Sequence, residues 1–318
     1  MLRLGLLSTA RINRSILAAA DHLDAVEVVA VASRDGERAR AYAAEHGLER
    51  AHGSYDALLG DDGVDAVYIS LPNGLHHEWT LRSLEAGKHV LVEKPYSRQP
   101  DDVEEAWATA ERAQLVVMEA FMYRHHPQIA AARALVKQGA IGRLRLVTAS
   151  FSFPLADPEN VRLVPELDGG ALMDVGCYCV SGSRLLAGEP DAVFGHAVLG
   201  PTGVDLEFHG LLRLPDEVIA RFDCSFALPS RQRLEAVGTD GTLVLEAPWR
   251  SDWGGRVLLN GEPVDVPTAN PFERELANFA AAVAEQAKPL LGREDALAQA
   301  RVIEALYRSA EAGQPVRL

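Results

Sequence analysis

The first 120 or so residues alternate short apolar runs with alanine-rich segments whose apolar residues recur at helical spacing. The apolar runs predict strands and the segments between them predict helices. Continuously apolar strands joined by helical crossovers indicate a parallel sheet covered on both faces. The predicted strands are Leu2–Leu7, Val26–Ala32, Asp65–Leu71, Lys88–Val92 and Leu115–Met118, and the predicted helices are Ile12–Ala20, Arg34–His46, Leu75–Ala86 and Asp101–Ala113.

After about residue 120 the pattern changes to strand after strand, which predicts a large, mainly antiparallel sheet. The predicted strands are Leu144–Phe153, Ala192–Val198, Val204–Leu212, Val218–Phe226, Arg231–Val237, Thr242–Glu246 and Val257–Leu259, and the predicted helices are Pro127–Gln138, Gly170–Leu186, Pro271–Gln286 and Arg293–Glu311. A chain of 318 residues is long enough for two domains. We therefore predict an α/β domain over residues 1–122 and an α+β domain with a large open-faced sheet over residues 123–318.

Charge and composition narrow the class of protein. The net charge is −14, which argues against nucleic acid or an anionic membrane surface as the main partner. Hydrophobic residues make up 48% of the chain, so intrinsic disorder is excluded. No apolar run reaches the roughly 20 residues that span a bilayer, and the N-terminus does not resemble a secretory signal. We expect a cytoplasmic protein.

Neither the cysteines nor the histidines predict a metal site. Three cysteines cannot form a disulfide framework, and none has zinc-type spacing, so we interpret them as small packing residues. The pairs His76-His77 and His125-His126 lack the spacing of a metal-binding helix, because adjacent helical residues point apart.

The turn after the first predicted strand is a candidate phosphate site, because the free amides and the dipole of a helix N-terminus favour phosphate. Ser8, Ala10 and Asn13 stand where a G-x-G-x-x-G loop has its glycines. Small and hydroxyl side chains can still meet the requirement, although an ordinary polar turn is an equal alternative. The candidate phosphate-binding residues are Ser8, Thr9, Ala10, Arg11 and Ile12.

The end of the second predicted strand favours NADP over NAD. An NAD site needs an acidic side chain here to bind the ribose 2′-hydroxyl. Ser33 and Arg34 instead offer donors for a 2′-phosphate, with Arg38 one helical turn further on. Asp35 fits a helix N-cap. The alternative for Arg34 is a solvated surface charge.

Two later turns follow strands of the same predicted sheet and should lie at the same edge. Leu71, Asn73 and His76 follow one strand, and Glu93 and Lys94 end the next. The alternative for His76 is a helix-start histidine bonded to the backbone.

Three residues carry candidate acid–base chemistry. The chain has only four lysines, so Lys94 is less easily explained as general surface charge, and the pKa of a lysine can be tuned as that of an arginine cannot. Asp174 and Tyr178 are four residues apart in the predicted helix Gly170–Leu186, hence on one helical face. A carboxylate beside a phenol is also a common structural pair.

Four motifs together resemble the glucose–fructose oxidoreductase/inositol dehydrogenase/rhizopine-catabolism (Gfo/Idh/MocA) family, and the resemblance covers essentially the whole chain. It implies an NAD(P)-dependent oxidoreductase of sugars, polyols or diols, with a Rossmann first domain and a second domain whose sheet forms the interface of a homodimer or homotetramer. The motifs are Pro72-Asn73-Gly74-Leu75-His76, Glu93-Lys94-Pro95, Glu119-Ala120-Phe121-Met122-Tyr123-Arg124 and Gly169-Gly170-Ala171-Leu172-Met173-Asp174-Val175-Gly176-Cys177-Tyr178.

The resemblance also implies roles for individual residues. It implies a cis bond between Lys94 and Pro95, with Lys94 between nicotinamide and substrate. Tyr178, where many members have histidine, is similar to the branch of aldose and dihydrodiol dehydrogenases, and the first turn looks most similar to NADP-dependent D-xylose 1-dehydrogenases. We expect Tyr178 to carry the proton, because a nearby ammonium would lower the pKa of its phenol. Asp174 would orient this pair or bind a sugar hydroxyl.

Several alternatives remain at this point. Tyr123, Arg124 and Arg162 are candidate substrate contacts, and each is as easily structural. The same residues would catalyse oxidation of a sugar or reduction of a keto-sugar or diketone. From another class, a non-catalytic NADP-binding regulator has the same fold, although retention of Lys94 and Tyr178 argues against it.

Overall fold

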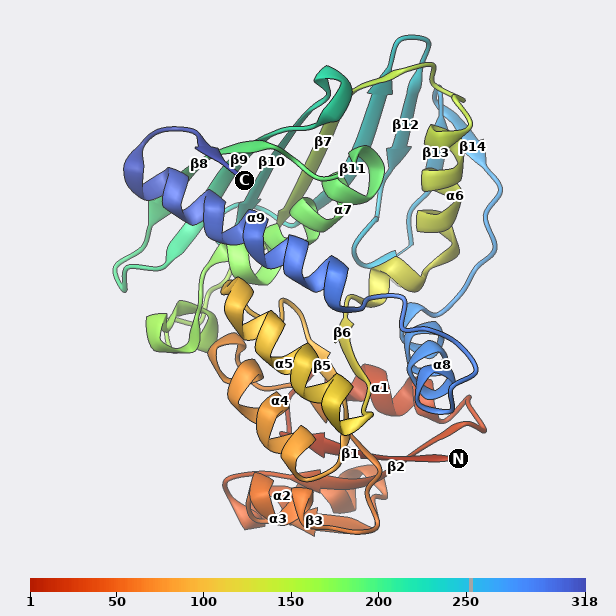
Figure 1. Ribbon diagram of the computed structural model, residues 1–318, viewed down its shortest axis with the longest axis vertical. Coiled ribbons are helices and arrows are strands. Elements are labelled where there is room, and N and C mark those ends of the chain that lie inside the picture. Colours follow the sequence, from red (N-terminus) through yellow and green to blue (C-terminus); the bar gives the residue numbers. More distant parts are fainter. Residues whose placement is uncertain (252–253) are drawn as a thin grey trace. The chain divides into compact units, whose positions relative to one another are not determined.

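The computed structural model describes residues 1–251 and 254–318, which form two compact units (Figure 1). Unit 1 comprises residues 1–97, 101–122 and 272–297, and unit 2 comprises residues 98–100, 123–271 and 298–318. A division of the chain into residues 1–122 and 123–318 is therefore too simple. After residue 271 the chain returns to unit 1, where residues 272–297 contribute one helix and the start of another.

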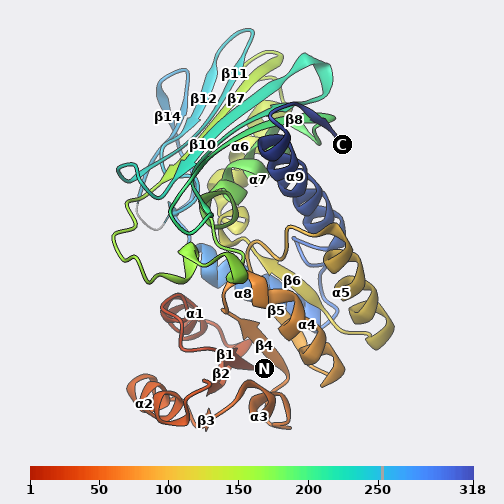
Figure 2. The ribbon, with the colours of Figure 1, turned by 90° about the vertical axis from the view of Figure 1, so that its left-hand side faces the viewer.

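Unit 1 is built on a six-stranded parallel sheet in the order β3-β2-β1-β4-β5-β6. The strands are β1 (Leu2–Leu7), β2 (Val26–Ala32), β3 (Arg50–His52), β4 (Ala66–Ile69), β5 (His89–Glu93) and β6 (Val117–Ala120). The helices are α1 (Asn13–Ala20), α2 (Gly36–His46), α3 (Tyr55–Leu59), α4 (His76–Glu85), α5 (Pro100–Ala113) and α8 (Pro271–Val283). Helices α1 and α2 lie on one side of the sheet, and α4 and α5 on the other (Figure 2). This confirms the doubly wound α/β fold.

The strand order of unit 1 determines where a ligand can bind. The chain runs outward from β1 to β3 and then crosses to β4 on the other side of β1. In open parallel sheets, ligands bind at the carboxyl ends of the strands where the order reverses in this way. The turns that follow β1, β2, β4 and β5 all lie at that edge.

Unit 2 contains a nine-stranded sheet in the order β14-β13-β12-β11-β7-β10-β9-β8-β15. Only the β7–β10 pair is parallel, which confirms the predicted, mainly antiparallel sheet. The strands are β7 (Leu144–Ser152), β8 (Ala192–Leu199), β9 (Asp205–Arg213), β10 (Ile219–Ser225), β11 (Arg231–Gly238), β12 (Thr242–Leu245), β13 (Val257–Leu259), β14 (Glu262–Val264) and β15 (Val316–Arg317). Helices α6 (Pro127–Lys137), α7 (Cys177–Ala187) and α9 (Arg293–Ala312) lie on one face of it (Figures 1 and 2).

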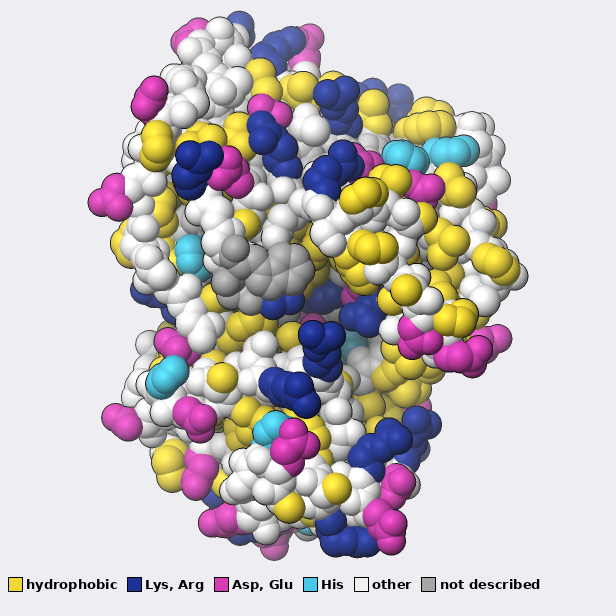
Figure 3. All heavy atoms as spheres, turned by 180° about the vertical axis from the view of Figure 1, so that it is seen from behind, with side chains coloured by type: hydrophobic (Ala, Val, Ile, Leu, Met, Phe, Trp, Pro, Cys, Tyr) yellow, Lys and Arg dark blue, Asp and Glu magenta, His cyan; other side chains and the backbone are white. Residues whose placement is uncertain are grey.

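The opposite face of this sheet is mixed in character. Outward residues of β10 and β11 are mostly charged, as in the ion pair between Arg231 and Asp223. The exposed apolar side chains lie instead at the end of β8 and β9, where Phe194 pairs with Leu211 across the strands. Figure 3 shows this face, with basic side chains near its middle and hydrophobic ones toward one edge.

The segment predicted as one helix over Gly170–Leu186 has two parts. Leu172–Gly176 forms a π-helical turn, and α7 begins only at Cys177. The α-helical spacing assumed for Asp174 and Tyr178 does not hold through this turn. Among residues 1–251 and 254–318, no helix combines the length and the apolar character that crossing a membrane requires.

Candidate active site

The turn between β1 and α1 replaces a glycine-rich loop with a hydrogen-bonded serine. Ser8 stands at the first glycine position and has a φ of +150°, a conformation that favours glycine. Its Oγ accepts from the Ala10 amide at 3.0 Å and lies 2.7 Å from the Oγ of Ser70, which follows β4. Asn13 Nδ2 donates to the Ser8 carbonyl at 2.8 Å. These bonds offset the backbone cost and explain how the turn forms without glycine.

The same turn leaves donors available at the start of α1. The amides of Arg11 and Ile12 have no hydrogen-bond partner in the described part of the chain, and no side chain caps α1. Free amides at a helix N-terminus bind phosphate. The turn therefore fits a dinucleotide pyrophosphate despite its sequence.

The end of β2 presents donors and no free carboxylate. Ser33 is buried, and its Oγ accepts from the Asp35 amide at 3.2 Å. The carboxylate of Asp35 caps α2 by accepting from the amides of Glu37 and Arg38, which confirms its predicted role. The side chains of Arg34 and Arg38 near this end of the strand are exposed.

Tyr55, at the start of α3, lies beside Arg34 and was not found from the sequence. Burial raises the pKa of its phenol, while the charge of Arg34 and a hydrogen bond from it act in the opposite direction. The ring packs edge-on against Trp79 at a centroid distance of 4.9 Å. Its hydroxyl therefore stands where it can orient the guanidinium of Arg34.

Substitution of Tyr55 by Phe should weaken NADP binding while preserving the fold. The phenyl ring keeps its packing against Trp79, and Arg34 loses one restraining hydrogen bond. One such bond corresponds to about two- to tenfold in affinity. Titration of NADP and NAD by fluorescence tests this. We expect the loss for NADP alone, and an equal loss for both cofactors would contradict a role through Arg34.

His76 lies between two of the turns at the ligand edge. The ring is fully buried, with Nδ1 2.9 Å from the Pro95 carbonyl oxygen and Nε2 2.8 Å from that of Leu71. Burial, and after it the charge of Lys94, lowers the pKa of His76 to about 4, while the contacts with the two backbone carbonyls act in the opposite direction. The structure thus shows the backbone-bonded alternative. His76 connects the turns that carry Asn73 and Lys94.

Lys94 follows β5 directly, and its bond to Pro95 is cis, as the resemblance implies. The carboxylate of Glu93 accepts from the Tyr68 hydroxyl and, at 3.3 Å, from the Lys94 amide. Glu275 on α8 is fully buried, and burial together with the charge of Glu93 raises its pKa well above the usual range.

In unit 2, the ring of Tyr178 is surrounded by other aromatic side chains. Its ring is 5.4 Å from that of Phe151, 5.6 Å from Tyr123 and 6.0 Å from Trp249, measured between centroids. The indole of Trp249 is fixed by its N–H, which donates to the Ser150 carbonyl at 2.9 Å. These rings leave Tyr178 only 7% exposed and restrict its orientation. Phe151 and Trp249 carry no motif, and sequence reasoning missed them.

The other candidates of unit 2 form two pairs of contacts. Arg162 Nε donates to the carboxylate of Asp174 at 2.6 Å, which joins two predicted site residues. The Tyr123 hydroxyl donates to Ser181 Oγ at 2.7 Å, and Arg124 reaches the same oxygen at 3.3 Å. The fully buried ring of Tyr123 favours the structural alternative for that residue.

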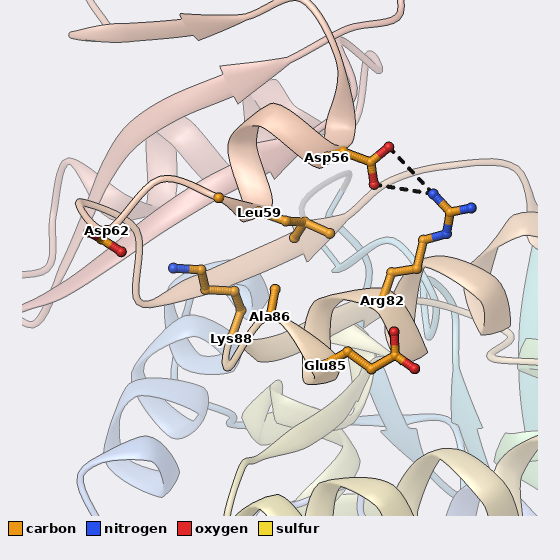
Figure 4. A pocket seen from close by; sticks show the side chains of 8 residues that line it. Asp56, Leu59, Asp62, Arg82, Glu85, Ala86 and Lys88 are labelled. Atoms are coloured by element: carbon orange, nitrogen blue, oxygen red, sulfur yellow. Dashed lines mark hydrogen bonds and ion pairs between the residues drawn. The ribbon is translucent and has the colours of Figure 1, made fainter.

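A separate hollow of about 710 Å³ opens on unit 1 (Figure 4). It lies at the amino ends of β4 and β5, opposite the candidate residues. Lys88 donates to the carbonyls of Asp61 and Val64, and Arg82 pairs with Asp56 at 3.1 Å. Its basic groups are therefore already bonded. The lining residues are Asp56, Leu59, Gly60, Asp62, Arg82, Glu85, Ala86 and Lys88.

Comparison with known proteins places this geometry in a family. Residues 3–121 match the model of the oxidoreductase family with an NAD-binding Rossmann fold, and residues 129–244 match the GFO/IDH/MocA C-terminal domain. The chain is 39% identical to a D-xylose 1-dehydrogenase (NADP(+)) from Haloferax volcanii, over 99% of each chain. The protein belongs to the Gfo/Idh/MocA family. As a member, it is an NAD(P)-dependent oxidoreductase.

Solved structures of related Gfo/Idh/MocA proteins agree over the full length. A 3-ketoreductase from Actinomadura kijaniata, in complex with NADP and TDP-benzene, has a TM-score of 0.90 at 32% identity and 97% coverage of each chain. An aldose-aldose oxidoreductase from Caulobacter crescentus, complexed with glycerol, has a TM-score of 0.91 at 28% identity, with 100% of this chain and 99% of that chain covered. A trans-1,2-dihydrobenzene-1,2-diol dehydrogenase from Xenopus laevis is 35% identical over 84% of this chain and 82% of its own.

Proposed function

We propose that the protein is an NADP-dependent oxidoreductase that transfers a hydride between the nicotinamide and a carbinol or carbonyl carbon of a sugar, as an aldose 1-dehydrogenase does. The observation that carries this proposal is the 39% identity to a D-xylose 1-dehydrogenase (NADP(+)) across 99% of both chains. The donors at the end of β2 support the choice of NADP.

The residues of unit 1 have defined tasks in this proposal. The amides of Arg11 and Ile12 bind the pyrophosphate, with Ser8 and Thr9 beside them, and Ser33 and Arg34 bind the 2′-phosphate. Leu71, Asn73 and His76 form the turn after β4 that borders the cofactor, and Glu93 and Lys94 form the turn after β5. When bound, the nicotinamide accepts or supplies the hydride.

Proton transfer is assigned to Tyr178. Oxidising a carbinol requires a base for the hydroxyl proton, but a free phenol has a pKa of about 10. We propose that the Lys94 ammonium favours the phenolate of Tyr178. Asp174, paired with Arg162, orients the substrate by accepting from a sugar hydroxyl. Lys94 and Tyr178 belong to different units, so kinetics must test whether they act together.

A second candidate is the reverse reaction, reduction of a keto-sugar. The observation that favours it is the likeness to the 3-ketoreductase from Actinomadura kijaniata. A spectrophotometric screen distinguishes the two. NADP+ would be tested with pentoses, hexoses, polyols and glycosides, and NADPH with keto-sugars. Turnover of aldoses supports the first proposal, and turnover of keto-sugars alone supports the second.

We also propose that a second copy of the chain covers the open sheet face of unit 2, at β8 and β9. Phe194 and Leu211, which lie opposite each other, are 38% and 42% exposed there, and Val198, further along β8, is 41% exposed. Large apolar side chains exposed on one face indicate an interaction surface. Leu211→Glu should shift the mass in solution toward the monomer. Leu290→Glu alters a similarly exposed leucine of unit 1 and serves as a control. A monomeric wild-type protein at micromolar concentration would contradict the proposal.

A further inference from the structure

The segment that carries Asp174 and Tyr178 begins at two glycines that allow very close approach. A Cβ on Gly169 would lie 2.4 Å from the Arg162 carbonyl oxygen. A Cβ on Gly170, where φ is +123°, would lie 2.2 Å from a carboxylate oxygen of Asp205. Because it lacks a Cβ, Gly169 leaves room for the backbone of Arg162. Gly170 in the same way leaves room for the carboxylate of Asp205, at the start of β9.

Asp205 binds the start of this segment from a distant strand. Its Oδ2 accepts from the Leu172 amide at 2.6 Å, at the first residue of the π-helical turn. Its Oδ1 accepts from the Tyr307 hydroxyl at 3.0 Å, from α9. One carboxylate therefore satisfies an amide that the first turn of a helix leaves without a partner, and it is itself held by a second helix.

Tyr307 is in turn fixed by further contacts within unit 2. Its ring packs edge-on against Phe208 at 5.7 Å, and the guanidinium of Arg98 lies 5.2 Å from the ring centroid. Arg98 also pairs with Asp168 at 3.0 Å. Arg98 follows Lys94 by four residues in the chain, yet it belongs to unit 2.

Burial makes the charged form of the Asp205 side chain unfavourable. The residue is 3% exposed, and burial raises its pKa to about 6 in spite of the bonds that it accepts. A neutral asparagine of the same shape would avoid this cost. The hydrogen bonds that the carboxylate accepts from Leu172 and Tyr307 offset part of this cost.

We infer that Asp205 is a positioning residue for the reaction: with Tyr307, it fixes the segment Gly170–Tyr178 and thereby places Asp174 and Tyr178. This inference rests on the proposed roles of Asp174 and Tyr178. A displacement of about 1 Å in a catalytic group costs on the order of 100-fold in rate. Loss of Asp205 should therefore lower kcat more than it weakens cofactor binding.

The test compares Asp205→Ala, Asp205→Asn and Gly170→Ala. We expect Asp205→Ala to lower kcat by about 10- to 100-fold per NADP-binding site, with the Kd for NADP unchanged. Asp205→Asn should restore kcat, because its amide group can accept from Leu172 and meet Tyr307. Gly170→Ala should also lower kcat, because its Cβ would displace the Asp205 carboxylate and because a φ of +123° is strained for alanine. Asp191→Ala, which removes an exposed carboxylate of unit 2, is the matched control.

Hydrogen exchange separates this inference from the proposed function. The amides of residues 170–178 should exchange faster in Asp205→Ala and at the wild-type rate in Asp205→Asn, whichever substrate is turned over. Unchanged exchange together with unchanged kcat would overturn the positioning role. If Asp205→Ala does not fold, Gly170→Ala and Tyr307→Phe provide the same comparison. Absence of wild-type turnover would count against the proposed function alone.

Discussion

Replacement of Tyr178 by Phe is expected to lower kcat by about 10²–10⁴-fold, the usual contribution of a general acid–base group. The phenyl ring keeps its contacts with Phe151, Tyr123 and Trp249. The aromatic packing around the ring is therefore kept, while the hydroxyl proposed to carry the proton is lost. The Kd for NADP should stay at the wild-type value. Steady-state kinetics and a fluorescence titration measure both quantities.

The same experiment tests whether Lys94 and Tyr178 act together. If the ammonium acts through the phenol, the loss in Lys94→Ala/Tyr178→Phe should be far smaller than the product of the two single losses. Tyr42→Phe alters a half-buried phenol on α2 and controls for general effects of the substitution. Near-normal turnover by Tyr178→Phe would remove this residue from the mechanism.

The second large effect concerns the choice of cofactor. Arg34→Ala should reduce the preference for NADP over NAD, measured as a ratio of kcat/KM values, by about 10- to 100-fold. This range follows from the loss of one charge-assisted hydrogen bond of about 1.5–3 kcal/mol. Arg40→Ala removes an exposed arginine of α2 and should leave the ratio unchanged.

The reciprocal variant should reverse the preference. In Ser33→Asp/Arg34→Ala, the new carboxylate repels a 2′-phosphate and accepts from a 2′-hydroxyl. An unchanged ratio in Arg34→Ala would assign the phosphate to another side chain. Arg38→Ala and Arg11→Ala would then identify it.

The main elements were predictable from the sequence because their burial leaves a long signal. Strands such as β1 and β2 are buried along most of their length, and their apolar runs coincide with the observed bounds. The strands β3, β14 and β15 were missed because none of their residues is buried, and α3 was missed because its five residues make little more than one turn. The gathering of candidate residues at one edge of unit 1 followed from a rule of parallel sheets.

What the sequence did not reveal are contacts between residues far apart in the chain. Nothing near Tyr55 indicates that it lies beside Arg34, and nothing near Asp205 indicates that it caps a segment that begins 35 residues earlier. The π-helical turn at Leu172–Gly176 could not be predicted either, because its residues have the pattern of an ordinary α-helix. Such features depend on tertiary packing, which local periodicity does not encode.

The most direct test of the account is the oxidation of D-xylose by the wild-type protein, with kcat/KM determined for NADP+ and NAD+ under the same conditions. We predict reduction of the cofactor with a clear preference for NADP+. Preference for NAD+ would contradict the role given to Ser33 and Arg34. Absence of turnover with D-xylose and every other aldose would contradict the proposed function itself.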